Sequence, residues 1–475
     1  MKPIEQKEHP SSPAKSVHLT AVCGTGMGAL ACMFKEAGFF VSGSDHHIYP
    51  PMSTFLEREG IKIMEGFRPE NLSHSPDLVV VGNAVSRDNP EVVGMFEMGL
   101  PYLSFPQALK QFFIREKKLL VVTGTHGKTT TASLLAWVLE SAGLDPGFMI
   151  GGILKNFGRN CKTGGGPFFV VEGDEYDTAF FDKGPKFLHY IPSRAVITSI
   201  EFDHADIYRD LDHLKGAFSD FVSAVPAASL LAVCNHYPAA IELTQNAACR
   251  TTTYGLNRKA EWHIADIAFE PPWARFTVVK NDLRFKEFRT PVIGEHNLLN
   301  ALSVIILAND IGLSAEQIEK GLETFEGVKR RQEIRGVKRG ITVIDDFAHH
   351  PTAVKETIRA VRAFYPEKRI AAVFEPRSNS SRRNIFQTEY AHSFDMADLV
   401  CVRKPTLLEK IPADERFSSE RLAADLRERG TDARCFPDTD TIIDFLKKNL
   451  QAEDVVLIMS NGGFDNIHER LLKSL

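Results

Sequence analysis

The chain has 475 residues, of which 43% are apolar and 25% are charged, and this composition predicts a soluble globular protein with about three domains. Its formal net charge of -5 gives no reason to expect a nucleic-acid or anionic-membrane partner. Seven cysteines without a Cys-x-x-Cys pair predict reduced thiols, and no apolar run reaches the ~18 residues of a membrane span. Residues 1–16 are a polar tail without a signal-peptide core, so we expect a cytoplasmic protein without membrane insertion.

The first elements predict a nucleotide-binding fold. An apolar strand at 17–23 leads through the turn Gly24-Thr-Gly-Met-Gly28 into a helix and then into a strand that ends at Asp45. The turn fits the pattern G-x-G-x-x-G/A, whose backbone N–H groups suit a pyrophosphate at a helix N-terminus. Alone it predicts NAD, with Asp45 on the ribose, but a nucleotide sugar also carries a pyrophosphate. Asp45 has the alternative role of a turn cap.

The most specific motif is a phosphate loop at Gly124-Thr-His-Gly-Lys-Thr-Thr130, between an apolar strand and an apolar helix. It is shorter than a full Walker A motif, which would have a glycine where Val122 stands. Backbone N–H groups from Gly124 to Lys128 would face an anion, Lys128 would reach the terminal phosphates, and Thr129 would hold Mg²⁺. A simple strand–helix turn is the alternative, but it leaves the lysine without a packing use.

Two later strands end in titratable residues. The strand at 167–171 runs into Glu172-Gly-Asp-Glu-Tyr-Asp177, where four crowded carboxylates need an offsetting cation. Glu172 is therefore predicted to bind a metal ion that faces Thr129. The strand at 194–200 is followed by His204 between acidic residues, which makes this histidine a candidate ligand of a second Mg²⁺, although a lone histidine is usually structural.

The last third of the chain predicts a second open α/β sheet, with strands at 341–344, 370–374, 399–402 and 455–459. The first of these strands precedes Asp345-Asp-Phe-Ala-His-His-Pro351, in which Asp345 has the alternative role of a helix cap. Three arginines follow the second strand, and arginine pairs with carboxylates in a bidentate manner.

Together these motifs resemble the Mur ligases, which join amino acids or peptides to UDP-N-acetylmuramic acid precursors of peptidoglycan. The resemblance covers residues 17 to about 472 and implies an α/β fold of three domains behind the polar tail. These are a Rossmann-like UDP-sugar-binding domain (17–117), a P-loop ATP-binding central domain (118–331) and a Rossmann-like acceptor-binding domain (332–475). Some Mur ligases carry a carbamylated lysine after the histidine, but Lys215 is out of register, so we expect none.

The resemblance also implies roles for individual residues, with ATP and Mg²⁺ as cofactors. Catalysis is expected from Lys128, Glu172, His204 and Arg330, the last as a clamp on the γ-phosphate, while the metal ligands are expected to be Thr129, Glu172 and His204. ATP binding is assigned to Gly124, Thr125, His126, Gly127, Lys128, Thr129, Thr130, His296, Asn297, Asn300, Arg330, Asp346 and His349. UDP-sugar binding is assigned to Gly24, Thr25, Gly26, Met27, Gly28, Ser44 and Asp45, and peptide binding to Arg377, Ser378, Asn379, Arg382 and Arg383. N-terminal capping by Asn297 is an alternative for that residue.

Within the family, segments 48–54, 375–379 and 403–412 are similar to the members that act on a murein tripeptide. The implied reaction joins L-alanyl-γ-D-glutamyl-meso-diaminopimelate to the lactyl carboxylate of UDP-N-acetylmuramate through an acyl phosphate. The alternative is addition of L-alanine, because those members share the Asp-Asp-x-x-His-His-Pro segment. Two other classes stay open: an NAD-dependent oxidoreductase, which would leave the phosphate loop unused, and a UDP-sugar sensor, which would lack intact metal ligands. We favour a monomer.

Overall fold

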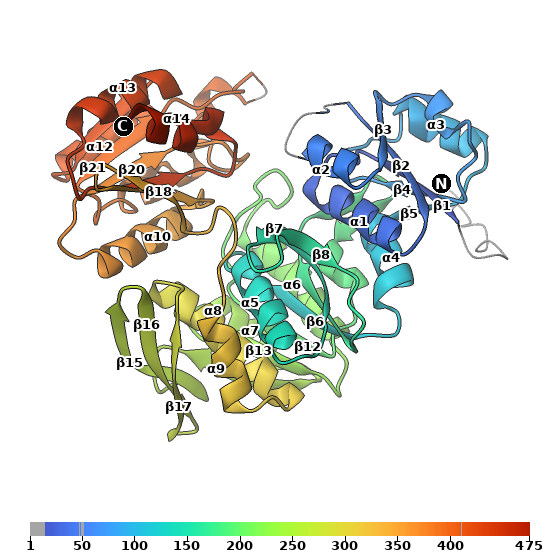
Figure 1. Cartoon of the computed structure of the whole chain (residues 1–475), viewed down its shortest axis with the longest axis horizontal. Helices are drawn as coiled ribbons and strands as arrows, with labels where there is room; N and C mark the ends of the chain where they lie inside the picture. The colour runs from blue at the N-terminus through green and yellow to red at the C-terminus, as the bar shows by residue number, and fades with distance from the viewer. Residues whose placement is uncertain (1–14, 47, 49–51, 410) are drawn as a thin grey trace.

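The computed structural model describes residues 15–46, 48, 52–409 and 411–475. Most of the expected polar tail (1–16) lies outside the described residues, and so do residues 49–51 of the segment 48–54. The described helices include none that is long and apolar enough to cross a membrane. Three large sheets follow one another along the chain, drawn in blue, in green to yellow, and in orange to red (Figure 1).

The first sheet is parallel and has the strand order β3-β2-β1-β4-β5. The order reverses beside β1, and the glycine turn between β1 and α1 lies at this switch point, where open α/β sheets bind ligands. Its elements are β1 (Ser16–Thr20), α1 (Thr25–Glu36), β2 (Phe40–Asp45), α2 (Met52–Arg58), β3 (Lys62–Glu65), η1 (Pro69–Leu72), β4 (Leu78–Val81), α3 (Pro90–Glu97), β5 (Tyr102–Ser104), α4 (Phe105–Leu109) and the π-helix η2 (Lys110–Ile114).

The central sheet has ten strands in the order β17-β16-β15-β14-β13-β12-β6-β9-β7-β8. Its first half comprises β6 (Lys118–Thr123), α5 (Lys128–Ser141), β7 (Gly147–Leu154), β8 (Arg159–Lys162), β9 (Phe168–Gly173), the hairpin β10 (Asp177–Ala179) and β11 (Asp182–Pro185), η3 (Lys186–His189) and β12 (Arg194–Ile197). The second half comprises α6 (Leu211–Ala224), β13 (Leu230–Cys234), α7 (Pro238–Thr244), β14 (Arg250–Gly255), β15 (Trp262–Glu270), β16 (Trp273–Lys280), β17 (Leu283–Thr290), α8 (Glu295–Ile311) and α9 (Ala315–Glu323).

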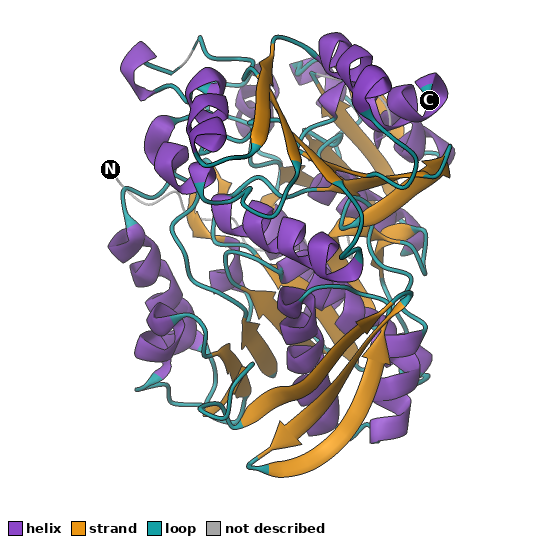
Figure 2. Ribbon diagram, turned by 90° about the vertical axis from the view of Figure 1, so that its left-hand side faces the viewer, coloured by secondary structure: helices purple, strands orange, loops and turns teal. Residues whose placement is uncertain are grey.

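Strand β6 lies between β9 and β12 and is parallel to both. Because carboxyl ends of parallel strands share one edge of a sheet, the phosphate loop, the acidic segment and the His204 loop meet there. Strands β15, β16 and β17 form an antiparallel extension, seen as long curved strands at the lower edge of the molecule in Figure 2.

The third sheet has the order β18-β19-β23-β20-β21-β22, in which only β18 is antiparallel to its neighbour. Apolar clusters cover both of its faces, which explains the nearly continuous apolar runs of its central strands. Its elements are β18 (Glu333–Lys338), β19 (Ile341–Asp346), α10 (Pro351–Phe364), β20 (Ile370–Phe374), η4 (Asn384–Phe386), α11 (Gln387–Ala391), β21 (Leu399–Arg403), η5 (Ala413–Glu415), α12 (Ser419–Glu428), β22 (Asp432–Phe436), α13 (Thr439–Asn449), β23 (Val455–Met459), η6 (Phe464–Asn466) and α14 (Ile467–Ser474).

The α/β fold class expected from the sequence is confirmed. Two strands end earlier than predicted: β1 at Thr20 instead of residue 23, and β12 at Ile197 instead of residue 200. Ala21 adopts a positive φ of 58°, which leaves the extended conformation and ends β1. After β12, Thr198 and Ser199 hydrogen-bond to the phosphate loop, which ends their pairing in the sheet.

Candidate active site at the edge of the central sheet

The phosphate loop requires its glycines. Gly124 and Gly127 have φ of 131° and 80°, and a Cβ on Gly127 would lie 2.6 Å from Asn300 Oδ1. The N–H of Thr125 donates to Ser199 O (3.0 Å), and that of His126 donates to Ser199 Oγ (2.7 Å). The expectation that all N–H groups of the loop face an anion is therefore wrong for Thr125 and His126, because the neighbouring strand end already binds them.

Lys128 is held across the loop by an unpredicted residue, Glu175. Its Nζ donates to Gly124 O (2.6 Å) and to both carboxylate oxygens of Glu175 (3.0 and 2.7 Å). His204 Nε2 lies 3.3 Å from Glu175 Oε1. Burial opposes ionisation of Glu175, yet Lys128 and His204 outweigh it and lower the pKa of Glu175 to about 2. Glu175 is 1% exposed, so it is a buried anion that joins two predicted site residues.

The sequence signal for Glu175 was the group of four acids at and after the end of β9, from which only Glu172 was selected. Both acids are next to the loop, but they have opposite environments. Glu172 Oε1 accepts the N–H of Gly151 (2.7 Å), and Thr129 donates to Glu172 Oε2 (3.2 Å). Burial and the charge of Asp174 raise the pKa of Glu172 to about 7, so this carboxylate lacks a sufficient cationic partner.

The predicted metal ligands are therefore divided into two groups. Glu172 faces Thr129, as expected, whereas His204 faces Glu175. Burial disfavours the charged imidazole of His204, but the hydrogen bond and charge of Glu175 raise its pKa. His204 also has a positive φ of 54°, which places strain beside the candidate site.

The two linker arginines point to different places. Arg330 Nη2 donates to Ser460 O (2.6 Å) and Gly462 O (2.5 Å), which fixes this guanidinium to the C-terminal sheet. Arg331 Nη2 instead donates to Thr129 Oγ1 (3.2 Å) on the phosphate loop. Arg331 is therefore the linker arginine at the loop, whereas the sequence had selected Arg330.

Three polar residues that open α8 lie close to the phosphate loop. Asn300 Nδ2 donates to Asn297 Oδ1 (3.1 Å), and Asn297 Nδ2 donates to Ile293 O (2.9 Å). The N-cap of α8 is Gly294, so the capping alternative for Asn297 is wrong. His296 is partly buried, and its buried Nδ1 has no hydrogen-bond partner; desolvation and the nearby charge of His126 lower its pKa to about 4. Thr130 lies in the first turn of α5.

The two aspartates at the end of β19 are both buried. Asp346 accepts the N–H groups of Ala348 (2.7 Å) and Gln332 (2.8 Å), which orders the linker. Asp345 pairs with Arg335 (3.2 Å) and lies 3.2 Å from His468, so its helix-cap alternative is wrong. His350 is instead the N-cap of α10.

His349 and the loop after β20 connect the third sheet to the His204 loop. His349 Nε2 lies 4.0 Å from Asp203 Oδ2, and Ser380 Oγ donates to Asp203 Oδ1 (2.8 Å). Asn379 Nδ2 donates to Asp206 (3.0 Å). The candidate peptide loop therefore lies against the segment that carries the candidate metal ligand His204.

The three arginines predicted to bind peptide differ in their contacts. Arg382 donates to Leu407 O (2.7 Å) and Asn379 Oδ1 (2.8 Å), and Arg383 pairs with Glu415. The guanidinium groups of Arg382 and Arg383 therefore hold neighbouring loops together. Arg377 is 38% exposed and its nearest carboxylate oxygen, on Glu375, is 3.8 Å away, which leaves Arg377 the most available cation of the three. Ser378 donates to Ser381 Oγ (2.9 Å) within the same loop.

Only some of the residues predicted to bind the UDP-sugar are accessible at the first glycine turn. Gly24, Thr25 and Gly26 are exposed, whereas Met27 and Gly28 are buried. Ser44 is fully buried and donates to Glu91 (2.6 Å), so its expected uridine contact is not supported by its position. Asp45 Oδ2 accepts the N–H of Cys23 (2.9 Å). Asp45 therefore caps the glycine turn, which is the alternative role that the sequence offered for it.

Comparisons with known proteins match this architecture. Family models match residues 16–117 (Mur ligase family, catalytic domain), 122–308 (Mur ligase middle domain) and 330–462 (Mur ligase, glutamate ligase domain). The UDP-N-acetylmuramate–L-alanyl-γ-D-glutamyl-meso-2,6-diaminoheptandioate ligase of Haemophilus influenzae is 39% identical over 97% of this chain and 99% of its own length. The UDP-N-acetylmuramate–L-alanine ligase of Acetivibrio thermocellus is 36% identical over 97% and 96%.

Solved structures give the same result. A murein peptide ligase from Psychrobacter arcticus has 34% identity and a TM-score of 0.72, with 97% of this chain and 98% of that chain covered. A UDP-N-acetylmuramate–alanine ligase from Thermotoga maritima has 26% identity and a TM-score of 0.78, with 96% and 98% covered. The chain therefore belongs to the Mur ligase family, whose members are carbon–nitrogen ligases.

Proposed function

We propose that this chain uses ATP to join the lactyl carboxylate of UDP-N-acetylmuramate to the α-amine of L-alanyl-γ-D-glutamyl-meso-diaminopimelate. The observation that carries the proposal is the 39% identity, over nearly the full length of both chains, to a ligase named for these two substrates. The alanine-specific relative is 36% identical, and the alanine ligase structure has the higher TM-score, so backbone shape does not separate the two acceptors. Membership of a ligase family sets aside the oxidoreductase and sensor alternatives.

The phosphate loop is proposed to bind ATP and to support phosphoryl transfer. A carboxylate is a poor electrophile because oxide is a poor leaving group, and transfer of the γ-phosphoryl group converts it to an acyl phosphate. Lys128 and Arg331 place positive charge where the phosphate would sit at Thr129. Binding of ATP would compete with Glu175 for the Lys128 ammonium, so the present pairing keeps the lysine charged and oriented. The opening of α8, with unpartnered His296, is the proposed adenine side of the site.

The residues at the loop also fit Mg²⁺. Thr129 and Glu172 offer hydroxyl and carboxylate oxygens, the ligand type that Mg²⁺ prefers. Burial and the charge of Asp174 raise the pKa of Glu172, so a cation bound there would favour its ionised form. A bound Mg²⁺ would neutralise phosphate charge during transfer. His204 would need to leave Glu175 to join these ligands, so we assign it to a second, separate position.

The acceptor is proposed to bind at the carboxyl end of β20. The tripeptide carries three carboxylates, and Arg377 is the exposed cation in the loop that contacts the His204 segment through Asn379 and Ser380. An acceptor bound at this loop would lie beside the His204 segment, and its proximity would favour attack by the amine over hydrolysis of the acyl phosphate. Gly24, Thr25 and Gly26 are the proposed contacts for the UDP diphosphate.

The domain limits 17–117, 118–331 and 332–475, a monomeric state and a cytoplasmic location remain parts of this proposal. The three large sheets support the division into three domains.

The test is incubation of the purified chain with ATP, Mg²⁺ and UDP-N-acetylmuramate, with tripeptide and L-alanine supplied in separate reactions. We expect inorganic phosphate and a product whose mass equals the sum of both substrates less one water, with the tripeptide as the better acceptor. A higher kcat/KM for L-alanine would replace this proposal by the alanine-adding reaction.

A further inference from the structure

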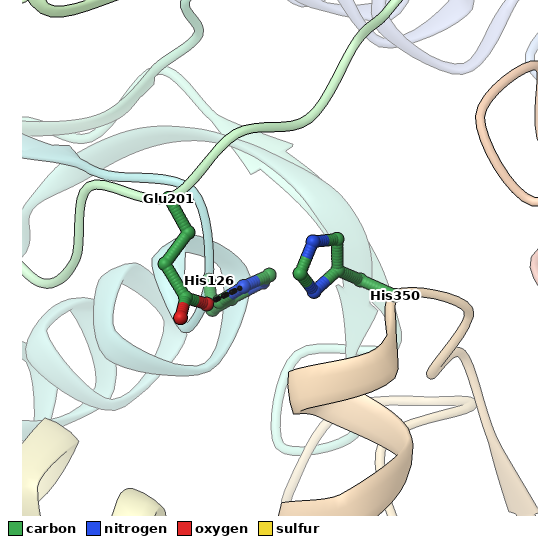
Figure 3. A group of neighbouring side chains, drawn as sticks. All are labelled: His126, Glu201 and His350. Atoms are coloured by element: carbon green, nitrogen blue, oxygen red, sulfur yellow. Dashed lines mark hydrogen bonds and ion pairs between the residues drawn. The ribbon is translucent and has the colours of Figure 1, made fainter. Parts of the chain in front are cut away.

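A cluster of two histidines and one glutamate spans the central and C-terminal sheets (Figure 3). His126 comes from the phosphate loop, Glu201 from the segment after β12, and His350 from the start of α10. His126 Nε2 lies 2.8 Å from Glu201 Oε2, and the two imidazole rings are 4.7 Å apart. One ligand atom from each residue lies within 4.8 Å of the other two. Among the described residues, no other group of three His, Cys, Asp or Glu side chains meets this condition.

The hydrogen bonds of His350 fix which of its nitrogens carries a lone pair. Its Nε2 lies 3.1 Å from Phe202 O, a pure acceptor, so the proton belongs on Nε2. Nδ1 is then unprotonated, and its one lone pair accepts a long hydrogen bond from the N–H of Thr352 (3.3 Å), the N-cap contact of α10, which a metal ion on Nδ1 would have to displace. A histidine that donates one N–H to a backbone carbonyl and presents its other nitrogen is the usual arrangement of metal-binding histidines.

The three side chains also differ in chemistry from the candidate Mg²⁺ ligands. Two imidazole nitrogens with one carboxylate oxygen favour Zn²⁺ and similar transition metals over Mg²⁺, which prefers oxygen alone. In a tetrahedral zinc site, bonds of about 2.1 Å place ligand atoms about 3.4 Å apart. The present atoms, within 4.8 Å of one another, would have to approach by up to about 1.4 Å, a movement that changes in side-chain torsions supply.

We propose that His126, Glu201 and His350 form a three-residue binding site for Zn²⁺ or a similar transition-metal ion, with a water molecule as the fourth ligand. Such an ion would cross-link the phosphate loop to the first turn of α10. The site would then hold two sheets together that supply different parts of the proposed active site. The binding of the ion does not depend on the proposed function; only its effect on ATP use does.

The test uses the full chain without a histidine tag and without nucleotide, so that it is independent of catalysis. Co²⁺ is titrated into the metal-free protein while its visible absorption is recorded, and Zn²⁺ is then added to displace it. We expect one Co²⁺ per chain with the intense bands of four-coordinate cobalt. The variants His350→Gln and Glu201→Gln should each weaken binding by at least about tenfold, since even residues behind metal ligands cost 10- to 100-fold.

The matched control is His392→Gln, because His392 is an exposed histidine of the C-terminal sheet outside the cluster. Far-ultraviolet circular dichroism and thermal unfolding would establish that each variant is folded, and Glu201→Gln serves if His350→Gln unfolds through loss of its helix-capping contact. Equal Co²⁺ affinity in the wild type, His392→Gln and both cluster variants would overturn the proposal, as would octahedral spectra with no saturable site. If ligation by the Co²⁺-binding protein fails for every acceptor, the proposed function falls while the metal site stands.

Discussion

The two linker arginines give a direct test of the proposed phosphate site. Arg331 lies 3.2 Å from Thr129 Oγ1, so a phosphate bound at Thr129 would be roughly 4–5 Å from its guanidinium. At an effective dielectric constant near 20, a unit charge pair at that distance is worth about 3–4 kcal/mol. If most of this interaction forms in the transition state, Arg331→Ala should lower kcat by on the order of 100- to 1000-fold.

Arg330→Ala is the matched control, because it removes the same side chain from the neighbouring position. Its guanidinium binds Ser460 O and Gly462 O, away from the phosphate loop. We expect less than a tenfold change in kcat, with a modest loss of thermal stability. Both variants should be assayed at saturating ATP, Mg²⁺, UDP-N-acetylmuramate and tripeptide, with phosphate release as the readout. A larger loss of kcat in Arg330→Ala than in Arg331→Ala would show that the arrangement of the linker in the active enzyme is different.

Three further predictions concern the other parts of the site. Lys128→Ala should abolish ligation but leave UDP-N-acetylmuramate binding intact by calorimetry; normal turnover would remove the loop from the mechanism. Arg377→Ala should raise the tripeptide KM by about 10- to 150-fold, the equivalent of a charge-assisted hydrogen bond of 1.5–3 kcal/mol, and an unchanged KM would contradict the acceptor assignment. Asp345→Asn should weaken hydrogen-exchange protection of β19 by on the order of 1–3 kcal/mol at pH 7, because it removes a buried carboxylate charge that faces the partly buried Arg335 and the buried His468. Burial opposes ionisation of Asp345, but His468 and two arginines lower its pKa, so the difference should shrink as pH falls below about 4; a constant difference would argue against this charge pairing.

Local sequence patterns were enough to predict the class of fold. Strands such as β4, β6 and β23 are continuous apolar runs because both faces of a parallel sheet are covered, and glycine turns mark where such strands enter helices. The family could also be predicted, since the phosphate loop and the Asp-Asp-x-x-His-His-Pro segment are each contiguous in the chain. The residues of such motifs are brought together by local turns alone.

Tertiary structure decided which of several nearby candidate residues makes each contact in the site. Glu175 is buried and Glu172, three residues earlier, is partly buried, yet Glu175 accepts Lys128 while Glu172 faces Thr129. Ser44 lies at the predicted edge of the first sheet, but its side chain points into a buried contact with Glu91. These contacts depend on elements that are distant in the sequence, and the motif itself gives no sign of where those elements lie.

The same reason applies to the linker and to the metal cluster. Arg330 and Arg331 have the same chemistry and adjacent positions, and only the packing of the C-terminal sheet separates their directions. His126, Glu201 and His350 lie more than 70 residues apart along the chain and meet because two sheets place their strand ends side by side. Sequence determined which residue types stand at strand ends, and long-range packing determined which of them meet, because contact energy depends on three-dimensional distance and not on position in the chain.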